Sequence, residues 1–272
     1  ATGTPAAAIE STTLRGFAGT FVDSVRLNGN SPWILPLGIF HRKRHRFGTQ
    51  YCPICLRLDA APYYRRSWRL AFIAECPDHQ CVLHDRCPTC GAAIVFQRIE
   101  LGTRWLRRVD ANTSCAVCGF DLRQTPANYY PWVDGKVCVA YRSLALFHWF
   151  ALNTTASKVT ASQQDLFSIF HTMANILLSR RVNLRGLGGN LGAKFPGIEN
   201  ARKTELSELE LLCPLDRLAI FEVALYLLME WPSNLKKTLW SVGVTYRALM
   251  YARENDAVWT EALQLSRQPA NS

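Results

Sequence analysis

Apolar residues recur three and four positions apart through most of the second half of the chain. This period predicts a helix with one apolar face from Ser162 to about Arg181. A second helix, opened by Pro214 and ended by Pro232, is apolar on most sides, so we expect it at the centre of the core. Further helical patterns cover Val137–Phe150, Glu205–Leu212, Leu235–Arg253 and Val258–Leu265.

Before residue 129 the helical period is weak. One apolar helical face is visible between Ser11 and Val25, although Gly16 and Gly19 weaken it. Two short strands are predicted at Ala92–Phe96 and Arg104–Val109. Both predicted strands lie in the region between residues 51 and 123.

Cysteine and histidine pairs with two intervening residues fill this region. They are Cys52/Cys55, Cys76/His79, Cys81/His84, Cys87/Cys90 and Cys115/Cys118. Such close pairs suit one metal ion better than long-range disulfides, because a tight turn can clasp the ion. Five pairs are available for the four that two tetrahedral zinc sites need.

We assign Cys52, Cys55, Cys76 and His79 to a first site. The second site takes Cys87, Cys90, Cys115 and Cys118, because sequential sites need only local closure. An interleaved arrangement stays open, in which the first and third of these four pairs, Cys52/Cys55 and Cys87/Cys90, share an ion. Closed sets of four protein ligands predict two structural Zn²⁺ ions, since a catalytic zinc keeps a position for water.

The modules and patterns together predict the fold class. We expect a mainly α chain with two small zinc-finger or zinc-ribbon modules and a C-terminal helical bundle that is compatible with a helix-turn-helix. The expected division is an N-terminal segment at residues 1–50, a tandem zinc region at 51–128 and a helical domain at 129–272.

The formal net charge is +10, and the chain stays basic after correction for seven thiolates and two Zn²⁺. A basic surface attracts phosphate backbones and other acidic partners. Three groups of residues are candidates for nucleic-acid or partner binding. They are Arg42, Lys43, Arg44 and Arg46 in one basic run, Arg65, Arg66 and Arg69 among aromatic residues, and Arg180, Arg181 and Arg185 after a predicted helix. Each group also has an ordinary role open to it: a linker, packing of a small module, or a helix C-terminus.

Several function classes are excluded or disfavoured. No apolar run approaches the roughly 18 residues of a membrane span, and no secretory signal is expected. The glycine-rich stretch 186–192 lacks the Gly-Lys-Ser/Thr ending of a nucleotide-binding loop. The zinc ligands do not match the patterns of metalloproteases or deaminases, so we expect no enzyme.

A known family carries a similar arrangement of motifs. The run Gln50–Leu56 (QYCPICL), then Trp68, Cys76–His79 (CPDH), Leu83 and Cys87–Cys90 (CPTC) resembles the TniQ family. That family includes TnsD-type target selectors of multi-subunit DNA transposons. The resemblance covers about residues 30–120, and Leu228–Pro232 is similar to the C-terminal helices of the family. The family's opening helical segment is expected to be missing or shortened before Ala1.

The resemblance implies a non-enzymatic adaptor for transposition. Such a protein binds target DNA or a CRISPR RNA-guided effector complex on DNA, and recruits the AAA+ ATPase regulator of the transposase. It implies a homodimer in some systems and a location in the bacterial cytoplasm, at the nucleoid. The alternative function is a zinc-containing, sequence-specific transcription regulator built from the same parts. Contact with the ATPase distinguishes the two.

Overall fold

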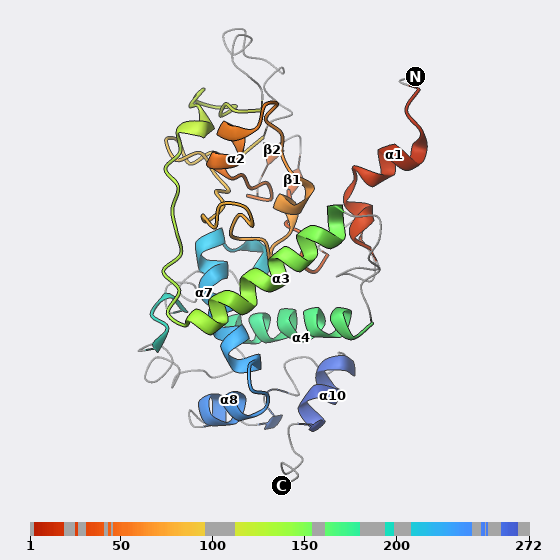
Figure 1. The fold of residues 1–272 in the computed structure, drawn as a ribbon, viewed down its shortest axis with the longest axis vertical. Coiled ribbons are helices and arrows are strands. Elements are labelled where there is room, and N and C mark those ends of the chain that lie inside the picture. The colour runs from red at the N-terminus through yellow and green to blue at the C-terminus, as the bar shows by residue number, and fades with distance from the viewer. Residues whose placement is uncertain are drawn as a thin grey trace. The chain divides into compact units, whose positions relative to one another are not determined.

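The computed structural model describes residues 3–18, 25–26, 31–40, 43–44, 46–95, 112–153, 161–179, 194–198, 208–240, 246–247, 249 and 257–265. The chain divides into two compact units (Figure 1). Unit 1 comprises Ala1–Ala18, Ser24–Pro131 and Cys213–Leu215, and unit 2 comprises Gly19–Asp23, Trp132–Leu212 and Asp216–Ser272. The three-part division expected from the sequence stays a prediction.

Unit 1 has little regular structure. Its described elements are α1 (Ala6–Ser11), η1 (Leu14–Phe17), β1 (Ile39–Phe40), β2 (Lys43–Arg44), α2 (Pro53–Leu58), η2 (Arg66–Arg69) and η5 (Leu122–Gln124), and the three η elements of this unit are 3₁₀ turns. The two strands form one antiparallel ribbon in which Ile39 lies opposite Arg44. Most of the described residues of this unit therefore lie in loops, which single bridges and side-chain contacts hold in place.

A buried aromatic core joins the start of unit 1 to its Cys/His region. The backbone N–H of Leu35 donates to the carbonyl of Arg69 (2.9 Å), and that of Ala71 donates to the carbonyl of Trp33 (2.7 Å). Beside these bonds the rings of Trp33 and Phe72 meet edge to face, with centroids 5.7 Å apart. Residues 33–35 and 69–71 thus pair across the core.

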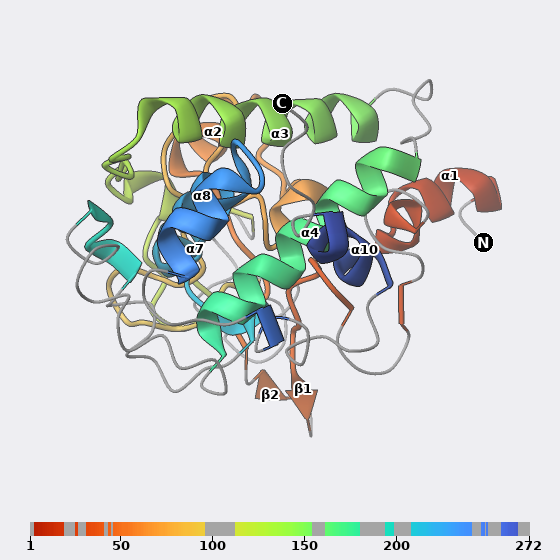
Figure 2. The ribbon, with the colours of Figure 1, turned by 90° about the horizontal axis from the view of Figure 1, so that it is seen from below.

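Unit 2 is helical. Its described elements are α3 (Gly135–Asn153), α4 (Ala161–Leu178), η6 (Leu209–Leu211), α7 (Pro214–Leu228, in this unit from Asp216 on), α8 (Ser233–Leu235), the π-helical turn η7 (Lys236–Trp240) and α10 (Ala257–Leu265). Figure 2 shows α10 alongside α4, and the two helices are in contact.

Helix α7 is the centre of unit 2, as its apolar pattern predicts. The ring of Phe221 lies 6.0 Å from that of Tyr141 on α3 and 5.2 Å from that of Phe170 on α4, measured between centroids. The buried carboxylate of Glu222 accepts from the backbone N–H groups of Val133 (2.6 Å) and Asp134 (3.2 Å). Helix α7 therefore also fixes the chain where α3 begins.

The predicted fold class is confirmed: the chain is mainly helical and carries two small Cys/His modules. The helix predicted at Glu205–Leu212 is wrong in its described part. Glu208 is extended, and only the 3₁₀ turn Leu209–Leu211 forms. Pro214 disfavours helical backbone at Cys213, so this segment does not continue into α7.

Three other predicted elements differ from the structure. Instead of one helix within Ser11–Val25, α1 ends at Ser11 and a 3₁₀ turn follows at Leu14–Phe17, where the Thr13 hydroxyl accepts from the N–H of Arg15. No strand forms at residues 92–95: Ala92 closes a hydrogen-bonded turn that begins at Cys87, and Ala93 makes an isolated bridge to Arg86. The strand predicted at Arg104–Val109 lies outside the described residues. The helix predicted at Leu235–Arg253 begins at Ser233 and becomes π-helical from Lys236.

None of the helices in the described part of the chain combines the length and the apolarity that a membrane crossing needs.

Candidate metal centres

The first Cys/His cluster draws its donors from two different local structures. Cys52 is the N-cap of α2, and its sulfur accepts from the backbone N–H of Cys55 (3.4 Å). Pro53 follows at the first helical position, where its missing N–H costs nothing. Cys76 and His79 come from a tight turn instead. A helix start and a turn therefore face each other across this cluster.

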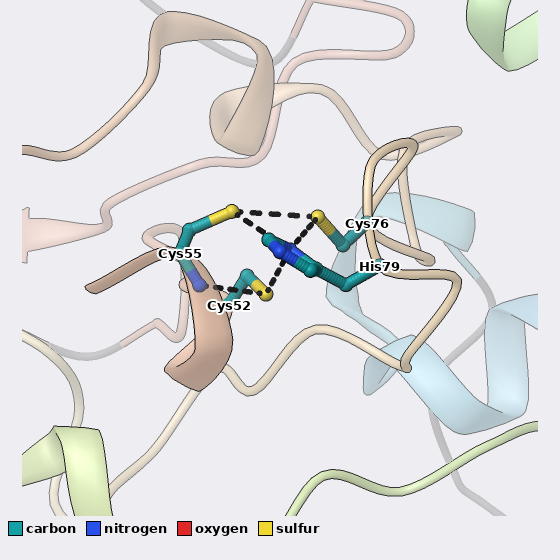
Figure 3. A group of neighbouring side chains, drawn as sticks. All are labelled: Cys52, Cys55, Cys76 and His79. Carbon is teal, nitrogen blue, oxygen red and sulfur yellow. Dashed lines mark hydrogen bonds between the residues drawn. The ribbon is translucent and has the colours of Figure 1, made fainter. Parts of the chain in front are cut away.

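The donor atoms of the first cluster converge on one point (Figure 3). The Nδ1 atom of His79 lies 3.6 Å from Cys52 Sγ, 3.3 Å from Cys55 Sγ and 3.5 Å from Cys76 Sγ. The sulfurs of Cys55 and Cys76 are 3.5 Å apart. A tetrahedral zinc ion separates two sulfurs by about 3.8 Å, and a sulfur from a nitrogen by about 3.5 Å. The observed distances fit that ion.

The second cluster combines Cys87, Cys90, Cys115 and Cys118. The sulfurs of Cys87 and Cys118 are 3.6 Å apart, as are those of Cys90 and Cys115. All four ligand atoms lie within 4.8 Å of one another. Cys90 and Cys118 are exposed, whereas Cys87 and Cys115 are buried. The structure thus brings together the two sequential sets that the spacing suggested, rather than the interleaved one.

Three of the four pairs sit in the same backbone turn, which we call the knuckle. In each, the N–H of the first cysteine donates to the carbonyl five residues later, and the N–H four residues later donates back to that cysteine's carbonyl. The knuckles are Cys76–Cys81, Cys87–Ala92 and Cys115–Phe120, with N···O distances of 2.7–2.9 Å. The candidate metal ligands stand at the first and fourth positions of every knuckle.

The fifth position of each knuckle requires left-handed backbone. Gly91 (φ 70°) and Gly119 (φ 75°) occupy it in the second cluster, but Gln80 (φ 55°) occupies it in the first. A side chain in this conformation costs about 1–2 kcal/mol, which glycine does not incur. The first knuckle is therefore strained where the other two are not.

Exchanging these residues tests the requirement for left-handed backbone. We expect Gly91→Ala to destabilise the metal-loaded protein by about 1–2 kcal/mol, because of backbone strain alone: an added Cβ meets no atom within 4 Å. Gln80→Gly is expected to raise the free energy of unfolding by up to about 1 kcal/mol. Glycine removes the strain of the folded turn, but it also raises the conformational entropy of the unfolded chain, which cancels part of the gain. Denaturant midpoints of both variants check this. An unchanged midpoint for Gly91→Ala would show that the conformation is not needed.

The protein groups alone do not favour four ionised ligands in either cluster. The hydrogen bond with Cys52 raises the pKa of Cys76 to about 12, and burial raises the pKa of Cys115 to about 12. A divalent cation reverses this balance, because a coordinated thiol loses its proton outright. The donor sets, three thiols with one imidazole and four thiols, suit Zn²⁺. Both clusters could therefore hold a metal ion.

The one pair assigned to neither site, Cys81 and His84, lies beside the first cluster. The Cys81 sulfur lies 3.5 Å from that of Cys52. The imidazole of His84 packs on the ring of Tyr51 instead, with centroids 5.5 Å apart, and burial lowers its pKa. The two members of this pair thus have separate surroundings.

The arginines of the Tyr63–Arg69 segment make contacts within unit 1. Arg65 donates twice to the carboxylate of Asp59, at 3.0 Å each, and its guanidinium lies over the ring of Trp68. Arg66 donates to the carbonyl of Thr13 (3.2 Å), and Arg69 to that of Leu35 (2.7 Å). Burial lowers the pKa of Arg69 to about 10. These contacts support the packing role that the sequence left open.

The basic run is described in part. Lys43 and Arg44 form β2, and Arg46 is exposed with its stem against Gly38, whose added Cβ would come within 2.5 Å of Arg46 Cγ. Arg42, Arg180, Arg181 and Arg185 lie outside the described residues. The sequence analysis did not name Arg86 among the candidate binding residues. Its guanidinium lies 4.0 Å from the ring centroid of Phe47, and it forms an ion pair with Asp85 (2.8 Å). Its position directly before Cys87 was the available signal.

Comparison with known proteins gives one match. Residues 1–83 match the family model described as TniQ. No curated protein and no solved structure matches the chain. The matched residues include all four donors of the first cluster and end before the second.

Proposed function

The chain belongs to the TniQ family, which is associated with DNA transposition, and from this premise we propose that it is an adaptor for target-site selection. It binds target DNA, or a CRISPR RNA-guided effector complex on DNA, and recruits the AAA+ ATPase regulator of the transposase. The observation that carries the proposal is the family match over residues 1–83.

The proposal includes two structural Zn²⁺ ions. Cys52, Cys55, Cys76 and His79 hold the first, and Cys87, Cys90, Cys115 and Cys118 hold the second. Distances near those of a tetrahedral ion and the thiol-rich donor sets support zinc over other ions. Four protein donors per ion leave no position for a substrate, so the sites organise unit 1 rather than perform catalysis.

Further parts of the proposal follow from the family. We propose a protein without catalytic activity, located in the bacterial cytoplasm at the nucleoid, that forms a homodimer when it docks on its target complex. The division into residues 1–50, 51–128 and 129–272 also remains part of the proposal. Size-exclusion chromatography with light scattering would test the dimer in solution.

Co-purification tests the adaptor function directly. A tagged full-length chain is isolated from its native cells, and its partners are identified by mass spectrometry. We expect an AAA+ ATPase encoded beside a transposase, together with DNA or a guide-RNA complex. Tight binding to one DNA site without any ATPase contact would contradict the adaptor and favour a transcription regulator.

The basic run, of which Arg46 is exposed, is the proposed contact with phosphates. Replacing Arg46 by Glu is expected to weaken binding to DNA or to the guide complex and to reduce the slope of log K against log salt by about 0.9 per lost phosphate contact. Arg57→Glu is the matched control, since Arg57 is also an exposed arginine of unit 1. Equal salt slopes for both variants would show that Arg46 makes no phosphate contact. Arg42, Lys43 and Arg44 share this proposed role, whereas Arg180, Arg181 and Arg185 are separate candidates.

A further inference from the structure

The first cluster has one thiol more than a tetrahedral ion needs. The Cys81 side chain is fully buried, and its sulfur is 3.5 Å from Cys52 Sγ. That separation equals the one between Cys55 Sγ and Cys76 Sγ, two donors of the same cluster. Cys81 therefore stands as close to a donor as the donors stand to one another.

The knuckle places this thiol two residues after His79, outside the pattern of candidate metal ligands. Donors stand at the first and fourth positions of all three knuckles, and Cys81 is the sixth residue of its own. The equivalent residues of the second cluster are Ala92 and Phe120, neither of which can bind a metal. Among the three knuckles, only the one in the first cluster therefore has an additional residue that could bind a metal.

We propose that Cys81 is a reserve ligand, which completes the first metal site when His79 does not coordinate. This inference rests on the proposed zinc binding. Rotation of the Cys81 side chain brings a thiol to the ion while Cys52, Cys55 and Cys76 keep their places. The thiol gives its proton to solvent as the sulfur binds, so no oxidation or reduction is involved. Zinc accepts four thiolates as readily as three with an imidazole.

The wild-type chain has no need of this ligand. Four donors already surround the point at which the ion binds, and His79 Nδ1 faces all three sulfurs (Figure 3). His79 is nevertheless partly exposed, whereas the three cysteines are buried. The imidazole is therefore the metal ligand that solvent reaches most easily, and the buried thiol beside Cys52 protects the site from losing the metal.

Metal content of the purified full-length variants tests the proposal. We expect two zinc ions per chain in the wild type and in His79→Ala, but only one in the double variant His79→Ala/Cys81→Ala. Cys90→Ala is the matched control: Cys90 is the fourth residue of a knuckle, as His79 is, but Ala92 follows in place of a thiol. It is expected to keep one zinc.

Cobalt substitution gives a second measurement. If Cys81 replaces His79, the Co²⁺-loaded His79→Ala protein shows a stronger thiolate-to-metal charge-transfer band than the wild type, since it has one more thiolate ligand. Loss of one zinc, or of folded unit 1, in His79→Ala would overturn the reserve ligand. A wild type that takes up no zinc would instead contradict the metal proposal itself, so the two failures are distinct.

Discussion

Replacing Cys87 by Ser is expected to remove the second metal ion and to unfold the part of unit 1 that surrounds it. The loss is large because structural zinc contributes on the order of 10–16 kcal/mol in apparent binding free energy. In the described part of this module, Cys90 and Cys118 are exposed, and so is Val117 between the two cysteines of its knuckle, so these side chains add little burial. Without the ion, the two knuckles lose the link between their cysteines, and apolar surface that becomes exposed then leads to aggregation.

Metal analysis and solubility measure this effect. We expect one zinc per chain in Cys87→Ser, compared with two in the wild type. Cys138→Ser is the matched control, because Cys138 is a half-buried cysteine on α3, outside both clusters. It should keep both ions and remain soluble. Two zinc ions per chain in Cys87→Ser would refute the assignment of Cys87 as a ligand.

The spacing of the cysteines and histidines in the chain predicted the two clusters, because the knuckle is a local structure. Its hydrogen bonds span six residues, so Cys-x2-Cys with a following glycine contains nearly all the information needed. The Cys52/Cys55 pair has the same spacing but forms at the start of α2. Pro53 at the first helical position was the local sign of that difference. Which pairs share an ion depends on tertiary structure, and spacing alone left two arrangements open.

Long-range contacts were not predictable in the same way. The carboxylate of Glu222 accepts from the N–H groups of Val133 and Asp134, nearly ninety positions earlier in the chain. In the sequence Glu222 is only a polar interruption of an apolar helix. Arg65 and Arg69 present a similar case, since a basic-aromatic segment suggests a binding surface until their partners Asp59 and Leu35 are known. Periodicity identified α3, α4 and α7 because each has a long apolar face of its own.

Replacing Gln50 by Glu is expected to destabilise unit 1 by about 3 kcal/mol or more, because buried polar groups lose their partners. The Gln50 side chain is fully buried, and its Nε2 lies 3.0 Å from the carbonyl oxygen of Trp68, 3.2 Å from that of Ile73 and 3.4 Å from that of Leu70. This one amide thus holds the turn of chain that leads to Cys76. A carboxylate at the same place donates nothing and faces three oxygens.

The pH dependence of this effect has a definite sign. Burial beside carbonyl oxygens raises the pKa of the new carboxyl above its unfolded value of about 4.3, because the protonated form can donate one hydrogen bond. The folded state then binds the proton more tightly, so the variant is most stable at low pH and loses stability as pH rises through the raised pKa. We expect the difference in unfolding free energy between variant and wild type to shrink as pH falls from about 8 to about 6.

Gln50→Leu separates the charge from the lost hydrogen bonds. It removes the amide at nearly the same volume and takes this donor from the carbonyls of Trp68 and Ile73, at a cost of about 1–3 kcal/mol. The carbonyl of Leu70 still accepts from the backbone N–H of Ile73. That cost should not vary with pH, because leucine does not titrate. Chemical denaturation of the zinc-loaded proteins at both pH values gives the comparison, and subtracting the wild type removes any pH dependence of metal binding that the three share. If Gln50→Glu and Gln50→Leu lost equal stability at every pH, the amide would be a packing element rather than the donor that positions the Trp68–Ile73 backbone ahead of the first metal site.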